Sequence, residues 1–194
     1  MKVSVSYPFM VLTAALIALD SEGFLLLTWS ALVVHELGHM AVIGLLGLEL
    51  RQLRLGLGGL RIDYGGRQTT YRQDILMALG GPLAGAFCAL VLALAARRRP
   101  AEWLYVLIGC HGVLTLFNLL PAMPMDGGRV LLAALCGPLG AMRAAKAVRI
   151  STGIVGIAIT VGGVWLLLES GGRTVVPVFT GVAVLVGCVR EGQG

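Results

Sequence analysis

The stretch TWSALVVHELGHMAVIGLLGL occupies residues 28–48 and holds two histidines and a glutamate, His35, Glu36 and His39, inside an otherwise apolar run. About 20 such residues are what an α-helix needs to cross the hydrocarbon core of a bilayer. Ionisable side chains are costly in that setting and usually mark a functional site. We therefore interpret this stretch as a membrane-spanning helix that carries chemistry.

His35 and His39 are four residues apart, so on a helix both imidazoles lie on one face and can reach one metal ion. Zinc held there would lower the pKa of a bound water to about 7. Glu36 is close enough to take a proton from that water and pass it to a leaving amine. The pattern predicts a zinc-dependent hydrolase with Glu36 as catalytic base. A chance match and a buried pair of structural histidines are the alternatives.

A catalytic zinc has three protein ligands and one open position, so a third ligand must come from elsewhere. Asp126 follows Pro121 and Pro124 and precedes Gly127 and Gly128, at the end of another apolar run. Irregular backbone near a membrane boundary is tolerated where protein packs around it or where it lines a wet cavity. We expect Asp126 to complete a site for one zinc ion per chain. The alternative is an ordinary turn residue before two glycines.

The composition places the whole chain in a membrane. Of its 194 residues, 57% are hydrophobic and 13% are charged, whereas soluble domains carry about 25% charged residues. We predict an all-α polytopic membrane protein, one domain over residues 1–194 with a catalytic core at about 28–149. The six predicted spans are Tyr7–Leu19, Thr28–Leu48, Ile75–Ala96, Trp103–Leu120, Ile150–Leu168 and Val175–Val189. The first could instead be a signal peptide.

The basic residues indicate the orientation of the chain. With these six spans, all but four of the 15 lysines and arginines fall on the side of the N-terminus. This imbalance predicts a multi-pass protein of the bacterial inner membrane with both termini in the cytoplasm, and the run Arg97–Arg99 is the exception. Because the cations lie between apolar runs, the net charge of +5 does not indicate a nucleic-acid partner.

The connection between the second and third spans has a pattern of its own. Residues 53–64 alternate between apolar and other residues around Gly58 and Gly59, which predicts a small membrane-associated β-hairpin. An unwound substrate helix needs partners for its backbone amides. We expect an edge strand of the hairpin to bind substrate by strand addition, with Leu55 and Leu57 in contact. A plain hairpin without contact to substrate is the alternative.

Two further patterns concern packing and the membrane surface. Arg143, Lys146 and Arg149 share one helix face, which predicts a short amphipathic helix within residues 129–149. The small residues of the third span predict close approach of neighbouring helices without any chemistry. These small residues are Gly80, Gly81, Ala84 and Gly85.

The His-Glu-Leu-Gly-His segment, followed by FNLLPAMPMDGGR at residues 117–129, resembles the site-2 protease family of intramembrane zinc metalloproteases. The likeness is closest to the compact bacterial branch that includes stage IV sporulation protein FB. It covers about residues 28–149, and the first, fifth and sixth spans match only in being apolar. Many relatives of that branch carry a C-terminal domain of paired CBS motifs, which we do not find before Gly194.

The resemblance implies zinc ligands at His35, His39 and Asp126, with Glu36 as the catalytic acid and base. It also implies that Asn118 holds substrate or the oxyanion. The expected substrates are transmembrane or membrane-associated proteins, often regulators of transcription that the cut releases. Neither the substrate nor the oligomeric state follows from the sequence.

Two positions depart from the family pattern. The segment GGPLAG at residues 80–85 resembles a Gly-Pro-x-x-Asn segment, but Gly85 stands where asparagine is usual. His111, two helical turns before Asn118 on the same face, stands where relatives often have asparagine. One interpretation of His111 is a hydrogen bond between helices. The other is contact with substrate or a proton relay.

Two other functions remain open at this stage. A metal transporter would also place histidine and aspartate inside spans, although it has no need of a glutamate at the offset of Glu36. A catalytically inactive relative that binds membrane proteins would be free to lose a member of the set, and this chain retains all of them.

Overall fold

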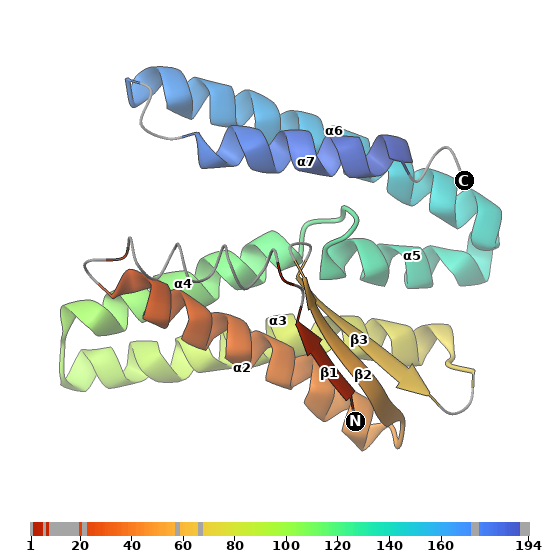
Figure 1. Cartoon of the computed structure of the whole chain (residues 1–194), viewed down its shortest axis with the longest axis horizontal. Coiled ribbons are helices and arrows are strands. Elements are labelled where there is room, and N and C mark those ends of the chain that lie inside the picture. Colours follow the sequence, from red (N-terminus) through yellow and green to blue (C-terminus); the bar gives the residue numbers. More distant parts are fainter. Residues whose placement is uncertain are drawn as a thin grey trace. The chain divides into compact units, whose positions relative to one another are not determined.

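The computed structural model describes residues 2–5, 7, 20, 23–56, 59–65, 68–171 and 175–190. Six helices and three strands lie within these residues (Figure 1). The helices are α2 (Phe24–Leu45), α3 (Tyr71–Arg98), α4 (Glu102–Asn118), α5 (Asp126–Leu139), α6 (Ala141–Glu169) and α7 (Val176–Arg190). The strands are β1 (Lys2–Val5), β2 (Glu49–Gly56) and β3 (Gly59–Gly65). Beyond Tyr7, the predicted first span lies outside the described residues, as does Leu57.

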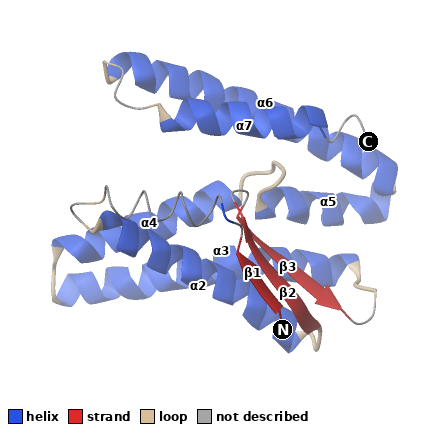
Figure 2. Ribbon diagram, viewed as in Figure 1, coloured by secondary structure: helices blue, strands red, loops and turns tan. Residues whose placement is uncertain are grey.

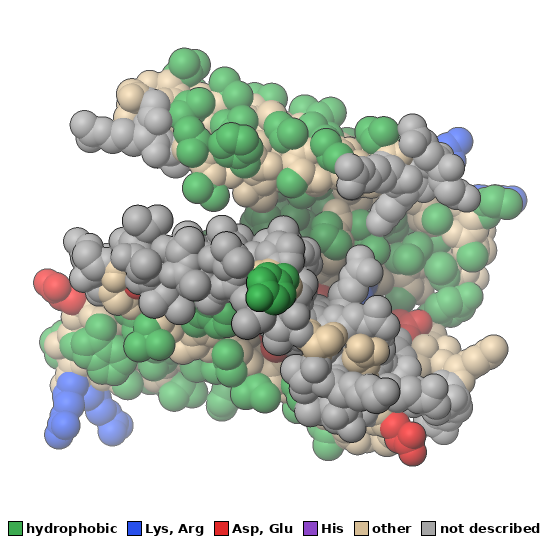
Figure 3. Space-filling model, in the orientation of Figure 1, with side chains coloured by type: hydrophobic (Ala, Val, Ile, Leu, Met, Phe, Trp, Pro, Cys, Tyr) green, Lys and Arg blue, Asp and Glu red, His purple; other side chains and the backbone are tan. Residues whose placement is uncertain are grey.

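Three of the described helices, α2, α3 and α6, are long and apolar enough to cross a membrane, and α7 is a shorter apolar helix. Large side chains along one face of α6 are exposed, among them Ile150, Ile154, Ile157 and Val161. Figure 3 shows hydrophobic side chains across the visible face of α6 and α7. Soluble proteins rarely leave such a continuous apolar face open to water. The face therefore suits contact with lipid.

Residues 1–69 and 79–116 form one compact unit, in which glycines allow close approach of α2, α3 and α4. A Cβ atom added to Gly38 of α2 would clash with the carbonyl oxygen of Gly80, and one added to Gly80 would lie 2.7 Å from the carbonyl oxygen of Gly38. A Cβ atom added to Gly85 would lie 2.5 Å from Oγ1 of Thr115 on α4. The expectation that small residues of the third span permit close packing is confirmed.

The same unit contains a three-stranded sheet of order β1-β2-β3 (Figure 2). β2 and β3 pair antiparallel across the predicted turn, and β1 pairs parallel with β2. Leu55 is opposite Val5 on one side and Leu60 on the other. The prediction that Leu55 lies on an open strand edge is therefore wrong, because β2 is the central strand. The sequence interpretation treated the first residues only as a lead into the first span.

Residues 70–78 and 117–194 form the second unit. The predicted short amphipathic helix within residues 129–149 is instead the start of a long one, because α5 ends at Leu139 and α6 runs from Ala141 to Glu169. Gly140 between them has a φ of +78°, a conformation that favours glycine and interrupts the helix. The three cations of the predicted face belong to the first turns of α6, where all are exposed. The three cations therefore lie at the start of a helix that is long enough to cross a membrane.

Candidate metal centre

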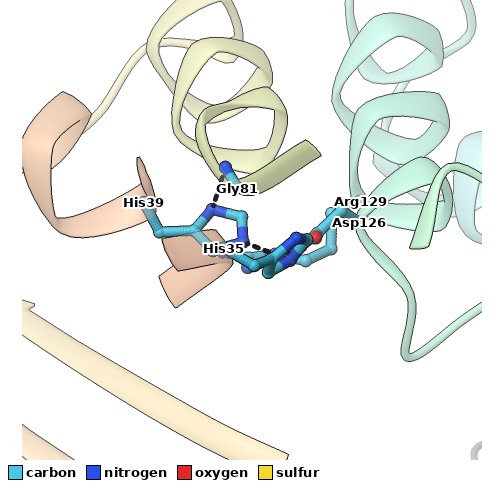
Figure 4. Close-up of polar contacts among 5 residues, drawn as sticks. All are labelled: His35, His39, Gly81, Asp126 and Arg129. Atoms are coloured by element: carbon cyan, nitrogen blue, oxygen red, sulfur yellow. Dashed lines mark hydrogen bonds and ion pairs between the residues drawn. The ribbon is translucent and has the colours of Figure 1, made fainter. Parts of the chain in front are cut away.

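The two histidines of α2 converge as their spacing predicts. Nε2 of His35 and Nε2 of His39 are 3.2 Å apart, and the rings meet edge to face with centroids separated by 4.9 Å (Figure 4). Their exposed fractions are 3% and 6%, so both imidazoles are withdrawn from the surface.

The separation of the two nitrogens fits a shared metal ion. Tetrahedral zinc with Zn–N distances of about 2.0–2.1 Å places two ligand nitrogens about 3.3–3.4 Å apart. The observed 3.2 Å between the Nε2 atoms is close to that value. Imidazole nitrogen is also a donor that zinc commonly takes in proteins. The pair is therefore suited to hold one ion between them.

Helix α3 lies directly against this pair at Gly81. The backbone N–H of Gly81 donates a hydrogen bond to Nδ1 of His39 over 3.3 Å (Figure 4). This contact fixes the His39 ring against α3 in the structure. The close contact of Gly38 with Gly80 brings α3 to this position. Small residues that we expected only to permit packing thus also border the candidate metal centre.

Glu36 follows His35 on α2 and is half-buried. Its place next to one histidine and three residues before the other is the arrangement that a base acting beside a metal requires. The structure thus keeps Glu36 on the helix that carries both histidines, as the sequence predicts. Its role in proton transfer stays a prediction.

Asp126 begins α5 and is buried, with an exposed fraction of 6%. Its carboxylate pairs with Arg129, at 3.6 Å between Oδ1 and Nη1, while the arginine side chain is 47% exposed. A carboxylate at the first turn of a helix is favoured by the helix dipole. Asp126 is therefore an ordered residue of a helix rather than part of a loose turn.

The segment before Asp126 is fixed by α6. The N–H of Met123 donates to Oγ1 of Thr152 over 3.0 Å, and Oγ of Ser151 donates to the carbonyl oxygen of Pro121 over 2.5 Å. Thr152 is only 1% exposed. A small apolar core joins the segment to α6 and α7. It contains Ala122, Met125 and Val184, with Phe117, Leu120 and Val155 packed against it.

The glycines that follow Asp126 have a structural reason. A Cβ atom added to Gly127 would clash with the backbone of Leu119 and Leu120, and one added to Gly128 would lie 2.5 Å from the carbonyl group of Ala122. The first turn of α5 therefore packs directly against the backbone of the preceding segment. This packing explains why two glycines follow the aspartate.

His35, His39 and Asp126 are all buried, and each offers one atom that could bind a metal ion. The sequence selected the same three residues, and their binding of one ion together stays a prediction. Two nitrogen donors and one carboxylate oxygen are a donor set that catalytic zinc commonly has, with a fourth position left open.

The other predicted site residues lie on α4. Asn118 is the last residue of the helix and is half-buried. His111 is 1% exposed, and its Nδ1 has no hydrogen-bond partner among the residues that the structure describes. The interpretation of His111 as a hydrogen bond between helices gains no support from this nitrogen. Contact with substrate stays a prediction for both residues.

Sequence reasoning missed the contacts made by Gly81, Ser151 and Thr152. Gly81 belongs to a segment that was singled out, but a glycine side chain gives no sign of a ligand nearby. Ser151 and Thr152 lie in the span that was judged only by its apolar character. Two hydroxyl residues in succession in such a span were the available signal, since polar groups there usually have a partner.

Comparison with known proteins agrees with this geometry. No protein-family profile matches the chain. Rip3 of Mycobacterium tuberculosis, named as a zinc metalloprotease, is 34% identical over 158 residues, which cover 71% of this chain and 40% of Rip3. Zinc metalloprotease MJ0392 of Methanocaldococcus jannaschii is 30% identical over 127 residues, which cover 62% of this chain and 37% of that protein. The chain thus spans less than half the length of either relative.

A solved structure shares the fold. The site-2 protease from Methanocaldococcus jannaschii matches with a TM-score of 0.67 and 23% identity, over 94% of this chain and 85% of that one. The described part of the chain has helices long and apolar enough to cross a membrane, and buried residues that could hold a metal ion. The chain is thus similar in sequence to zinc metalloproteases and shares its fold with a site-2 protease, and its membership of the site-2 protease family stays a prediction. Its place in the sporulation branch of that family stays a prediction.

Proposed function

We propose that this protein is an intramembrane zinc metalloprotease that hydrolyses peptide bonds of transmembrane or membrane-associated proteins. The observation that carries the proposal is the buried pair of Nε2 atoms, 3.2 Å apart, on a helix long and apolar enough to cross a membrane. Few functions other than metal chemistry explain two imidazoles at that separation in such a helix. The names of the relatives support hydrolysis in particular.

The proposed roles follow from the chemistry of the residues. His35, His39 and Asp126 hold one zinc ion. Zinc bound there supplies a Lewis acid and makes water a stronger nucleophile at neutral pH. Glu36 takes the proton of the attacking water and returns it to the leaving amine. Asn118 hydrogen-bonds the substrate backbone or the oxyanion, where a fixed amide stabilises developing charge.

We propose that substrate reaches the site in an extended form. A transmembrane helix must unwind before water can attack it, and its freed amides need partners because each unpaired group costs several kcal/mol in hydrocarbon. The sheet β1-β2-β3 offers such partners by strand addition. With β2 enclosed by its two neighbours, the added strand must pair with β1 or β3. Backbone pairing of substrate with Leu55 is therefore not proposed, and contact of substrate with Leu57 stays a prediction.

The cellular role extends the proposal. The charge imbalance supports a multi-pass protein of the bacterial inner membrane with both termini in the cytoplasm. Its partners are the lipid bilayer and a single-span or membrane-associated regulator, whose cleavage would release a soluble domain. No nucleic-acid partner is proposed. The protein acts in this scheme as a protease of regulated intramembrane proteolysis.

The test uses the full chain reconstituted in lipid vesicles with a fluorescent single-span substrate. We expect cleavage that stops when a chelator removes the metal and returns when zinc is added. A parallel measurement of zinc flux across the same vesicles distinguishes the transporter. Zinc flux without cleavage would overturn the proposal in favour of transport, and binding of the substrate without cleavage would favour an inactive relative.

A further inference from the structure

The backbone of α3 comes nearest to the histidine pair at Gly81. A Cβ atom built on Gly81 would lie 2.6 Å from Nε2 of His35 and closer still to Nε2 of His39. Real Cβ atoms essentially never approach a heavy atom within 3.0 Å. The two nitrogens that face one another across 3.2 Å therefore converge on the space that this glycine leaves empty.

We propose that Gly81 is a positioning residue that keeps the place of the metal ion open, an inference that rests on the proposed zinc site. An ion at about 2.0–2.1 Å from both nitrogens would lie within about 3.2 Å of a carbon at the built Cβ position. That carbon would crowd the ion and its open coordination position as well as the rings. Any side chain at residue 81 thus competes with the metal for one volume.

The neighbouring glycines of α3 have different surroundings. The Cβ position of Gly80 faces the backbone of Gly38 and the side chain of Val42, and that of Gly85 faces Thr115. Both belong to helix packing, and neither lies against an imidazole nitrogen. Gly81 alone of these three glycines faces the candidate ligands, so its contribution can be separated from that of close packing.

The backbone of Gly81 adds a second contact with the same pair. Its N–H donates to Nδ1 of His39, while the missing side chain leaves Nε2 of the same ring accessible. Pro82 follows, is fully buried, and has no N–H of its own to continue the hydrogen bonds of α3. At Gly81 the backbone of α3 therefore contacts the His39 ring through its N–H, while the space beside the two Nε2 atoms stays free of a side chain.

The experiment measures zinc affinity rather than cleavage. Wild type, Gly81→Ala and Gly85→Ala are purified in detergent, stripped of metal and titrated with zinc against a chelating dye. We expect Gly81→Ala to weaken zinc binding at least tenfold and Gly85→Ala to retain it, because only the first substitution reaches the imidazoles. Cobalt in place of zinc supplies an absorption spectrum, which should change in Gly81→Ala if any metal is retained.

Other results would contradict either the role of Gly81 or the zinc site itself. Wild-type affinity and an unchanged cobalt spectrum in Gly81→Ala would overturn the inference. Equal loss in Gly81→Ala and Gly85→Ala would assign the effect to displacement of α3 and would overturn it as well. Zinc binding that survives His35→Ala would contradict the proposed zinc site itself. Gel filtration and thermal unfolding of the metal-free proteins test whether each variant folds, and a Gly81→Ala protein that fails to fold without metal would show that the glycine is required by the fold itself and would overturn the inference too.

Discussion

The backbone N–H of Gly81 and Nδ1 of His39 are joined by a hydrogen bond of 3.3 Å, which connects α3 to the helix of the candidate ligands. One turn further along α3, Gly85 makes the close contact with Thr115 of α4. Glycines of α3 therefore lie against polar side chains of both α2 and α4. The close packing of α3 against α2 keeps the candidate ligand side chains in one arrangement, which a catalytic metal site requires.

Replacing Glu36 with glutamine should separate catalysis from metal binding. Glutamine preserves the size of the side chain but cannot accept a proton from water at neutral pH. We expect cleavage of a single-span substrate to fall by roughly 100-fold or more, since general bases typically contribute 10²–10⁴. Zinc content should stay at the wild-type value, measured by elemental analysis of the same preparation.

The neighbouring Leu37 provides a control for this variant, because it is 54% exposed and points away from the buried histidines. Leu37→Ala should leave both cleavage and zinc content near wild type. Cleavage by Glu36→Gln at the wild-type rate would remove Glu36 from the mechanism. Loss of zinc in that variant would instead make Glu36 part of the ligand set.

Removal of Asp126 should weaken metal binding. Asp126→Ala deletes a charged ligand, so the loss of zinc affinity should exceed the 10–100-fold that changes in outer partners of a metal site typically cause. Arg129→Gln is the matched control. Its pair with Asp126 is 3.6 Å long and solvent-exposed on the arginine side, and exposed pairs contribute about 0–1 kcal/mol. Full zinc occupancy in Asp126→Ala would exclude Asp126 as a ligand.

Thr152→Val should show that α6 supports the segment before Asp126. The variant leaves the N–H of Met123 without its acceptor at a part-buried position, and such a loss costs about 1 kcal/mol of unfolding free energy. Thr180→Val is the control, since the exposed hydroxyl of Thr180 bonds only the carbonyl oxygen of Val176 in its own helix. Equal thermal stability of the two variants would argue against this supporting role.

The candidate metal ligands could be selected from the sequence because their signal is local. Four-residue spacing on a helix determines that His35 and His39 share a face, whatever surrounds them. Asp126 could be selected because irregular backbone inside an apolar region must be packed in protein or line a wet cavity, which marks it as a candidate site. The residues that hold these candidate ligands in place could not be selected in the same way. Gly81, Ser151 and Thr152 contact partners that are far away in sequence.

The errors in the fold have a similar origin. Alternation within residues 53–64 indicates strands, but the parallel partner β1 comes from the first residues of the chain, and pairing over that distance leaves no local pattern. The division at Gly140 was missed because the cations of the following turns suggested one amphipathic helix. Helices commonly end at a glycine with positive φ, so Gly140 was the residue that could have indicated a helix end here.

Strand addition should be visible by crosslinking. A photoreactive residue at Ile62 of β3 should crosslink an extended substrate peptide more strongly than one at Leu53, which is opposite Ile62 on the central strand. The reason is that the backbone of β2 is already paired on both sides, over the range where β1 and β3 flank it. Equal crosslinking from the two positions, or none from Ile62, would contradict addition at the β3 edge.

His111 allows a test in which structure and function predict opposite effects. Its Nδ1 lacks a partner among the described residues, and replacing a buried unpaired polar group with an apolar one of similar size is nearly neutral or stabilising. His111→Leu should therefore unfold at the same temperature as wild type or higher. If His111 hydrogen-bonds substrate, the same variant should raise KM several-fold with little change in zinc content. Thr115→Val, one turn along α4 with another buried hydroxyl that lacks a described partner, serves as the comparison. An unchanged KM in His111→Leu would remove His111 from the substrate site, and a lower unfolding temperature would assign it a structural role instead.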